Sequence, residues 1–138
     1  MSLNIFVFIN VANNKSIITI TSVVIISKHK VRFQPFIAKN GLTFCNGTSS
    51  IEAAIYALDL RPNSEILIPS STFNASIGPI INLNFVPKFV DIDKETLTID
   101  CKDLENKINE NTKALIIVHP WGYPCNMDKI LEIVQKYD

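Results

Sequence analysis

The chain has 138 residues, of which 47% are hydrophobic and 19% are charged, and its formal net charge is zero. A chain of this length and composition can bury a core, which excludes a disordered protein. The zero net charge gives no case for a nucleic-acid partner. The three cysteines, Cys45, Cys101 and Cys125, lack paired spacing, so we expect no disulfide framework, no metal site and a reducing, cytoplasmic location.

The N-terminal part differs from the rest, because residues 1–51 contain five basic residues and no acidic one. The β-branched runs at 17–21 and 23–26 predict strands or a poorly ordered extension. Polar residues throughout 3–27 argue against a membrane segment, and no positive charge precedes the apolar run as in a signal peptide. A membrane or targeting role is the alternative. We therefore divide the chain into an N-terminal extension, 1–37, and a folded domain, 38–138.

From residue 42 onward, predicted strands and helices alternate with short connections. Apolar runs predict strands at 42–45, 65–68, 87–91 and 114–118. Capping signals and helical spacing predict helices at 49–60, 74–83 and 100–107, and a last helix capped by Asn126. The first of these helices should begin with a capping box in which Ser49 and Glu52 satisfy each other's backbone N–H groups.

This alternation favours right-handed crossovers and an α/β fold, with a mainly parallel sheet and flanking helices on both faces. Ligands of such sheets bind beyond the carboxyl ends of the strands. The turns at 45–50, 69–74 and 119–125 all follow predicted strands on that edge. We expect the functional site there. Because a parallel sheet is normally covered on both faces, we also expect this chain to leave an open strand edge.

Gly47, Thr48 and Ser49 lie at a predicted helix N-terminus. Free N–H groups and a partial positive charge at such a position suit a phosphate, and glycine allows close approach of the backbone. Ordinary helix capping needs the same residues and is the alternative. The motif is neither a P-loop nor a dinucleotide fingerprint.

Three further positions each allow two interpretations. Phe73 ends a polar turn after a buried strand, where it could stack on a planar ring or pack into the core. His119 directly follows a buried strand, but without a nearby carboxylate or nucleophile it more simply bonds backbone and positions its loop. Asp91 and Asp93 could bind a cation, although a solvated turn is the simpler interpretation.

Taken in order, these segments resemble the DegT/DnrJ/EryC1/StrS family of pyridoxal-phosphate-dependent sugar aminotransferases. The resemblance covers roughly residues 38–138. The matching segments are Asn46-Gly47-Thr48, Glu65 through Phe73, Pro87 through Asp93, Thr112 through His119, Gly122-Tyr123-Pro124 and Met127-Asp128.

The resemblance implies a partial large domain of the aspartate-aminotransferase type, which is pyridoxal-phosphate fold type I. It also implies a dimeric enzyme that moves an amino group from an amino donor to a nucleotide-linked keto sugar. Carried over, Gly47 and Thr48 would hold the cofactor phosphate, and Phe73 would stack on its pyridine ring. His119 and Gly122 would belong to the loop that shapes the same sheet edge.

The resemblance also implies an incomplete site, because the family's Schiff-base lysine and pyridine-nitrogen aspartate come later than the matched segments. We assign no catalytic residue and expect this chain to be inactive by itself. An alternative is a non-catalytic partner, or degenerate gene product, that associates with a full-length relative. Another is an unrelated binder of phosphate ligands that uses only the Gly47 turn.

Overall fold

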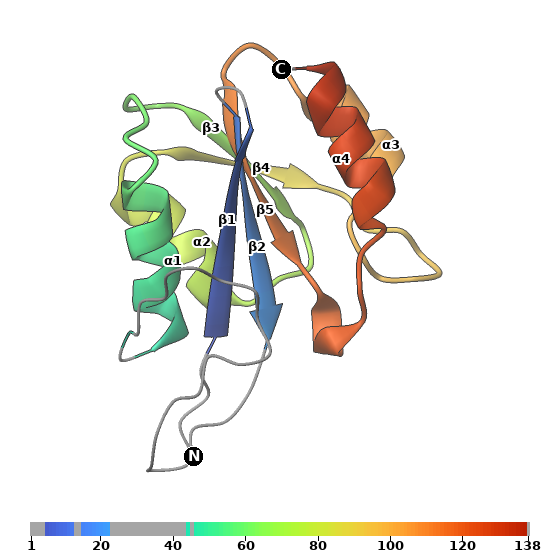
Figure 1. The fold of residues 1–138 in the computed structure, drawn as a ribbon, viewed down its shortest axis with the longest axis horizontal. Helices are drawn as coiled ribbons and strands as arrows, with labels where there is room; N and C mark the ends of the chain where they lie inside the picture. The colour runs from blue at the N-terminus through green and yellow to red at the C-terminus, as the bar shows by residue number, and fades with distance from the viewer. Residues whose placement is uncertain (1–4, 13–14, 23–43, 45, 138) are drawn as a thin grey trace.

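The computed structural model describes residues 5–12, 15–22, 44 and 46–137, which build one five-stranded sheet (Figure 1). The strands follow the order β1-β2-β5-β3-β4 across the sheet. β1 and β2 form an antiparallel hairpin, whereas β2, β5, β3 and β4 are mutually parallel. Their bounds are β1 Ile5–Ala12, β2 Lys15–Ser22, β3 Glu65–Pro69, β4 Val86–Val90 and β5 Thr112–Val118.

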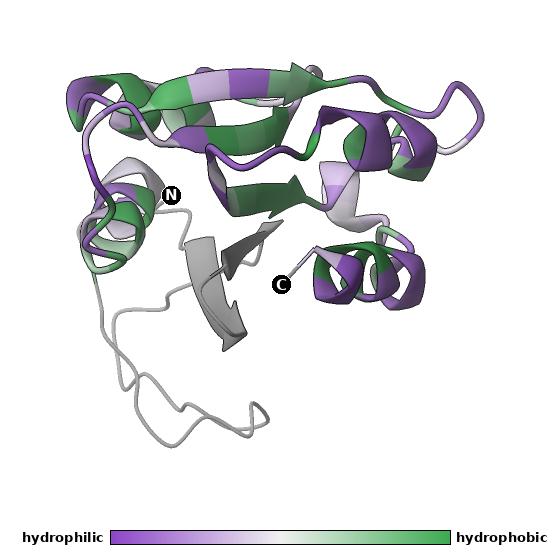
Figure 2. Cartoon of the chain, turned by 90° about the horizontal axis from the view of Figure 1, so that it is seen from above, coloured by the Kyte–Doolittle hydropathy of each residue, from purple (hydrophilic) through white to green (hydrophobic). Residues whose placement is uncertain are grey.

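Three α-helices lie between the parallel strands along the chain, and a short 3-10 turn and a fourth α-helix follow the last strand. In Figure 1, α1 and α2 lie to one side of β5, and α3 and α4 lie to the other. Figure 2 shows hydrophilic residues on the outer turns of the helices and largely hydrophobic strands between the two helix layers. The helical elements are α1 Gly47–Tyr56, α2 Asn74–Asn82, α3 Cys101–Lys107, η1 Pro120–Gly122 and α4 Met127–Lys136.

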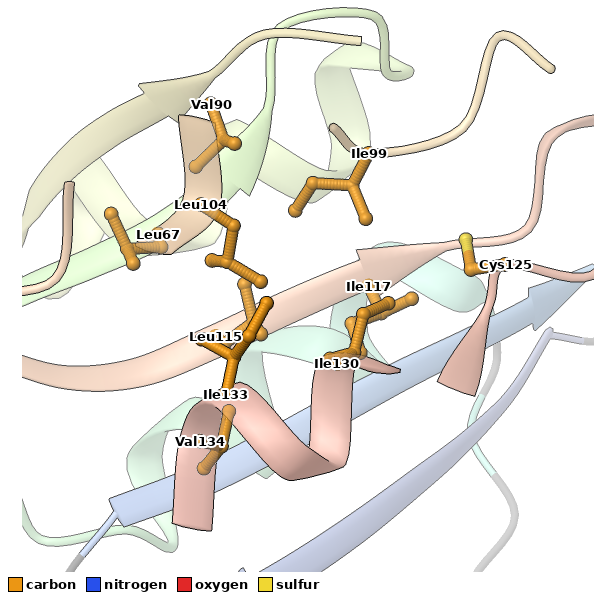
Figure 3. Packing of buried hydrophobic residues seen from close by; sticks show 10 residues of the cluster. All are labelled: Leu67, Val90, Ile99, Leu104, Leu115, Ile117, Cys125, Ile130, Ile133 and Val134. Carbon is orange, nitrogen blue, oxygen red and sulfur yellow. The ribbon is translucent and has the colours of Figure 1, made fainter. Parts of the chain in front are cut away.

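Two buried clusters, one on each face of the sheet, follow from the alternation of side chains along β3 and β5. The first cluster joins these strands to α1 and α2 and contains Ile51, Ala54, Ile55, Ile66, Ile68, Ile80, Ala114 and Ile116. The second joins them to α3 and α4 (Figure 3) and contains Leu67, Val90, Ile99, Leu104, Leu115, Ile117, Cys125, Ile130, Ile133 and Val134. Burial on both faces explains the continuous apolar runs and confirms the expected α/β class.

The elements expected from residue 65 onward are confirmed to within two residues at nearly every boundary. Asp100 caps α3 by accepting hydrogen bonds from the N–H groups of Lys102 and Asp103. Asn126 caps α4 by accepting one from Lys129. The strand expected at 42–45 lies outside the described residues except for Phe44, which has no regular secondary structure.

The expected capping box at Ser49 is wrong. The side-chain Oδ1 of Asn46 accepts the Ser49 N–H at 2.9 Å, and α1 already begins at Gly47. Asn46, three residues before Ser49, accepts the Ser49 N–H that the capping box would have paired with the Glu52 side chain. Ser50 lies inside the first turns, where its hydroxyl donates to the Gly47 carbonyl at 2.7 Å. The helix also ends at Tyr56 rather than at residue 60, and Asp59 takes a left-handed φ of 49° soon afterwards.

The N-terminal residues supply two strands, of which the sequence indicated one. The run at 17–21 lies within β2, whereas β1 was not foreseen, and the run at 23–26 and the boundary at residue 37 lie outside the described residues. β2 pairs along the outer side of β5, which the described chain would otherwise leave open. In the described part of the chain, no helix is long and apolar enough to cross a membrane.

Replacing the α1 cap should weaken the fold measurably. Asn46→Ala removes the acceptor of the Ser49 N–H, so we expect the free energy of unfolding to fall by about 1 kcal/mol. Asn46→Ser is the matched control, because serine caps helices as well as asparagine does. Urea unfolding of the three proteins measures this, and equal losses in both variants would show that the cap does not stabilise α1.

Candidate functional site

The parallel strands end at one edge of the sheet, and the polar turns singled out from the sequence leave from that edge. Figure 1 shows α1 starting on the side toward which the arrowheads of β2 and β5 point. The ladder between β3 and β4 continues to Pro69 and Val90, but the ladder between β3 and β5 ends at Leu67 and Leu115. β3 and β5 therefore separate toward their carboxyl ends, where the loops 70–73 and 119–125 begin.

The N-terminus of α1 presents free backbone donors at this edge. Gly47 is buried and Thr48 is exposed. Asn46 occupies the Ser49 N–H, whereas no described residue accepts from the backbone N–H groups of Gly47 and Thr48. These two N–H groups, the Thr48 hydroxyl and the positive end of the helix dipole together suit an anion such as phosphate.

The turn after β3 holds an exposed ring beside a buried hydroxyl. Phe73 is 77% exposed, so the alternative in which it packs into the core is wrong. Its backbone carbonyl accepts the Ser76 N–H at 2.9 Å, which starts α2. Among the described residues, Thr72 Oγ1 is buried without any hydrogen-bond partner. An unpaired buried hydroxyl costs about 1–3 kcal/mol, so this oxygen is a candidate for contact with a ligand.

His119 has the positioning role that the sequence favoured. Its Nδ1 accepts the backbone N–H of Cys125 at 3.0 Å, which closes the loop after β5. Nδ1 therefore carries no proton, and the neutral ring carries its proton on Nε2. Burial lowers the pKa of His119 from its usual value, which keeps the imidazole neutral at pH 7.

The same loop carries two exposed aromatics on a strained backbone. Trp121 is 83% exposed and Tyr123 is 56% exposed. Trp121 has a left-handed φ of 51°, and Gly122 follows with a φ of 82°. A left-handed conformation costs a non-glycine residue roughly 1–2 kcal/mol, and burial of the indole does not offset this cost. Strained residues cluster at functional sites, and nothing in the sequence around Trp121 indicated the strain.

Asp93 closes a turn after β4, as the simpler interpretation held, and Asp91 before it is exposed. Asp93 Oδ1 accepts hydrogen bonds from the N–H groups of Glu95 and Thr96, and from the Thr96 hydroxyl. These hydrogen bonds lower the pKa of Asp93, with the largest effect from the Thr96 N–H and the next largest from the Glu95 N–H. The described residues contain no group of three or more acidic, histidine or cysteine side chains that could hold a metal ion.

The described residues of this edge can bind and orient a ligand, but they show no activated nucleophile. Burial raises the pKa of the Cys125 thiol, which donates to the Val118 carbonyl at 3.2 Å. A protonated, buried thiol is a poor nucleophile. The sequence identified the α1 corner, Phe73 and His119 but missed Thr72, because only the packed turn shows that its hydroxyl has no partner.

Acid should destabilise the protein through His119. Because its pKa is lower in the folded state, its contribution is full above the unfolded value near 6.5 and is lost as pH falls toward the folded pKa. His119→Asn should flatten this part of the stability profile, since asparagine can accept the Cys125 N–H without titrating. His29→Asn removes the other imidazole and is the control. The free energy of unfolding is measured from pH 7.5 to 5 for both variants. A flatter pH profile in His29→Asn alone would contradict the assignment to His119.

Relieving the strain at Trp121 should stabilise the fold. Trp121→Asn places a residue that tolerates left-handed φ at an exposed position, so we expect a gain of about 0.5 kcal/mol. Tyr123→Asn is the matched control, because Tyr123 is also exposed but has a φ of −75°. Thermal unfolding measures both, and a loss at Trp121 equal to that at Tyr123 would show that the backbone there is not strained.

Comparison with known proteins identifies relatives of this chain and of its fold. The model of the DegT/DnrJ/EryC1/StrS aminotransferase family matches residues 26–138. The chain is 38% identical over 94 residues to a GDP-perosamine synthase of Escherichia coli, a match that covers 68% of this chain and 26% of the synthase. It spans about a quarter of the length of such relatives.

Two solved structures share the arrangement of strands and helices. A sugar aminotransferase from Micromonospora echinospora is 32% identical with a TM-score of 0.59, and the match covers 64% of this chain and 24% of that one. The GDP-4-keto-6-deoxy-D-mannose-3-dehydratase of Escherichia coli, solved with bound hydrated PLP, is 30% identical with a TM-score of 0.61, again over 64% and 24%. The fold is thus part of a fold type I large domain, and the chain belongs to the DegT/DnrJ/EryC1/StrS aminotransferase family.

Proposed function

We propose that this chain provides the phosphate-binding and ring-stacking part of a pyridoxal-phosphate site that serves nucleotide-linked keto sugars. The observation that carries the proposal is the buried, unpaired hydroxyl of Thr72 beside the exposed ring of Phe73. Family membership supports the cofactor, because solved relatives include a form with bound hydrated PLP.

The donors at this edge fit the phosphate of such a cofactor. Gly47 and Thr48 would hold the phosphate through their backbone N–H groups, and the hydroxyls of Thr48 and Thr72 are further donors. Phe73 would lie against the pyridine ring, for which its exposed face is free. When bound, the cofactor supplies an electron sink for chemistry at the substrate carbon.

The described residues supply binding and orientation rather than proton transfer. His119 is neutral and its Nδ1 is occupied, so it holds the loop instead of acting as a base there. The Schiff-base lysine and the pyridine-nitrogen aspartate, which the family resemblance places after the matched segments, are the groups that the reaction needs. We therefore propose that the chain by itself binds the cofactor weakly and does not turn over.

The reaction type is left open by the relatives themselves. One is named a sugar aminotransferase and another a 3-dehydratase, and both match this chain equally well in coverage. Amino transfer from an amino donor to a keto sugar is our proposal, following the family name. The cytoplasmic location expected from the cysteines stays a prediction.

A second candidate is a non-catalytic partner that associates with a full-length relative or with itself. The exposed Trp121 and Tyr123 on one loop favour it, since clustered exposed aromatics mark interaction surfaces. A pull-down with a full-length family member separates this candidate from the first, because the cofactor-site proposal needs no partner for binding.

Binding of pyridoxal phosphate should depend on Phe73. We expect Phe73→Ala to weaken binding about fivefold, which corresponds to about 1 kcal/mol of ring stacking. Tyr56→Ala is the matched control, because Tyr56 is 75% exposed on α1 but lies at the other end of that helix. Pyridoxal without phosphate should bind much more weakly. Isothermal titration measures all four cases, and equal affinities for the two variants would contradict a site at Phe73.

An activity assay tests separately whether the chain is inactive by itself. The chain, supplied with pyridoxal phosphate, glutamate and a nucleotide-linked keto sugar, should produce no amino sugar above background. Clear turnover would show that this chain has its own catalytic residues.

A further inference from the structure

β2 supports the part of β5 that carries the candidate site. The β2–β5 register runs from the pair Ser16 and Ala114 to the pair Ile20 and Val118. The β3–β5 register ends at Leu115. In the described chain, residues 116–118 of β5 are therefore paired with β2 alone, directly before the loop that begins at His119.

The winding of the chain makes the position beside β5, which β2 occupies, the next one across the sheet. The crossover from β4 to β5 passes through α3, and α4 packs on the same face of the sheet as α3. Right-handed crossovers on one face move across the sheet in one direction. A strand that followed α4 in this fold would accordingly lie beside β5, at the position that β2 occupies.

The hairpin is also separate from the family's part of the chain. The family match begins at residue 26, whereas β2 ends at Ser22. β2 contacts η1, and β1 contacts α1, so the hairpin reaches both elements that frame the candidate site. Hydrogen bonds to β5 and these contacts attach it to the rest of the described structure.

We propose that the β1–β2 hairpin is an added edge element that takes the strand position beside β5, covers this edge and fixes the carboxyl half of β5. Without it, residues 116–118 would present unpaired backbone groups of a strand that is apolar on both faces. Such an edge recruits another strand. The partner it fits is a second copy of this chain, whose own β5 would pair antiparallel across a twofold axis.

Proline scanning of β2 in the full chain tests this role. Ile18→Pro removes a backbone N–H in the middle of β2, at the residue paired with Ile116. Lys15→Pro is the matched control, because Lys15 is the first residue of β2, where proline is tolerated, and it precedes the β2–β5 register. Hydrogen exchange by mass spectrometry and light scattering after size exclusion are recorded for both variants and the unmodified chain.

We expect the effect on hydrogen exchange to be confined to the carboxyl end of β5. Ile18→Pro should speed exchange at residues 116–118 at least tenfold, leave residues 66–68 of β3 protected, and produce dimers at concentrations where the unmodified chain and Lys15→Pro do not. Unchanged exchange at 116–118 in Ile18→Pro would overturn the proposal. If Ile18→Pro does not fold, the unmodified chain decides: exchange at 116–118 as fast as in an unpaired segment, with 66–68 protected, overturns it as well.

Discussion

The burial of β5 on both faces is the constraint on which the rest of the structure depends. Ala114 and Ile116 face the α1–α2 cluster, and Leu115 and Ile117 face the α3–α4 cluster. A strand buried on both faces cannot leave its backbone groups unpaired at low cost, so it needs a neighbour on each edge. β3 supplies one neighbour over the first half of β5, and β2 supplies the other to its end.

The candidate site lies where β5, within the described chain, no longer has a neighbour on the β3 side. Because β3 continues with β4 while β5 continues with β2, the sheet parts between β3 and β5 at the carboxyl edge. The turn with Thr72 and Phe73 leaves one side of this opening, and the loop that begins at His119 leaves the other. Irregular backbone at such an opening must satisfy its polar groups locally, and the His119–Cys125 hydrogen bond does so for one loop.

Two features of the candidate site lower the stability of the fold. The unpaired Thr72 hydroxyl costs about 1–3 kcal/mol, and the left-handed backbone of the exposed Trp121 costs about 1–2 kcal/mol. The helices that begin after β4 and β5 have their N-caps in place at Asp100 and Asn126. Departures from local rules are typical of binding sites, although Leu97, in the turn after β4, also has a left-handed φ of 57°.

The sequence by itself determined the α/β class, the elements from residue 65 onward, and the edge that carries Gly47, Phe73 and His119. These follow from short-range signals, namely apolar runs, capping residues and turns that end strands. The tertiary structure decided the rest: that Asn46 rather than Ser49 caps α1, that Phe73 is exposed, that Thr72 Oγ1 lacks a partner, and that β2 covers β5. Burial and long-range strand pairing depend on which segments meet in space, and no local pattern of residues encodes that meeting.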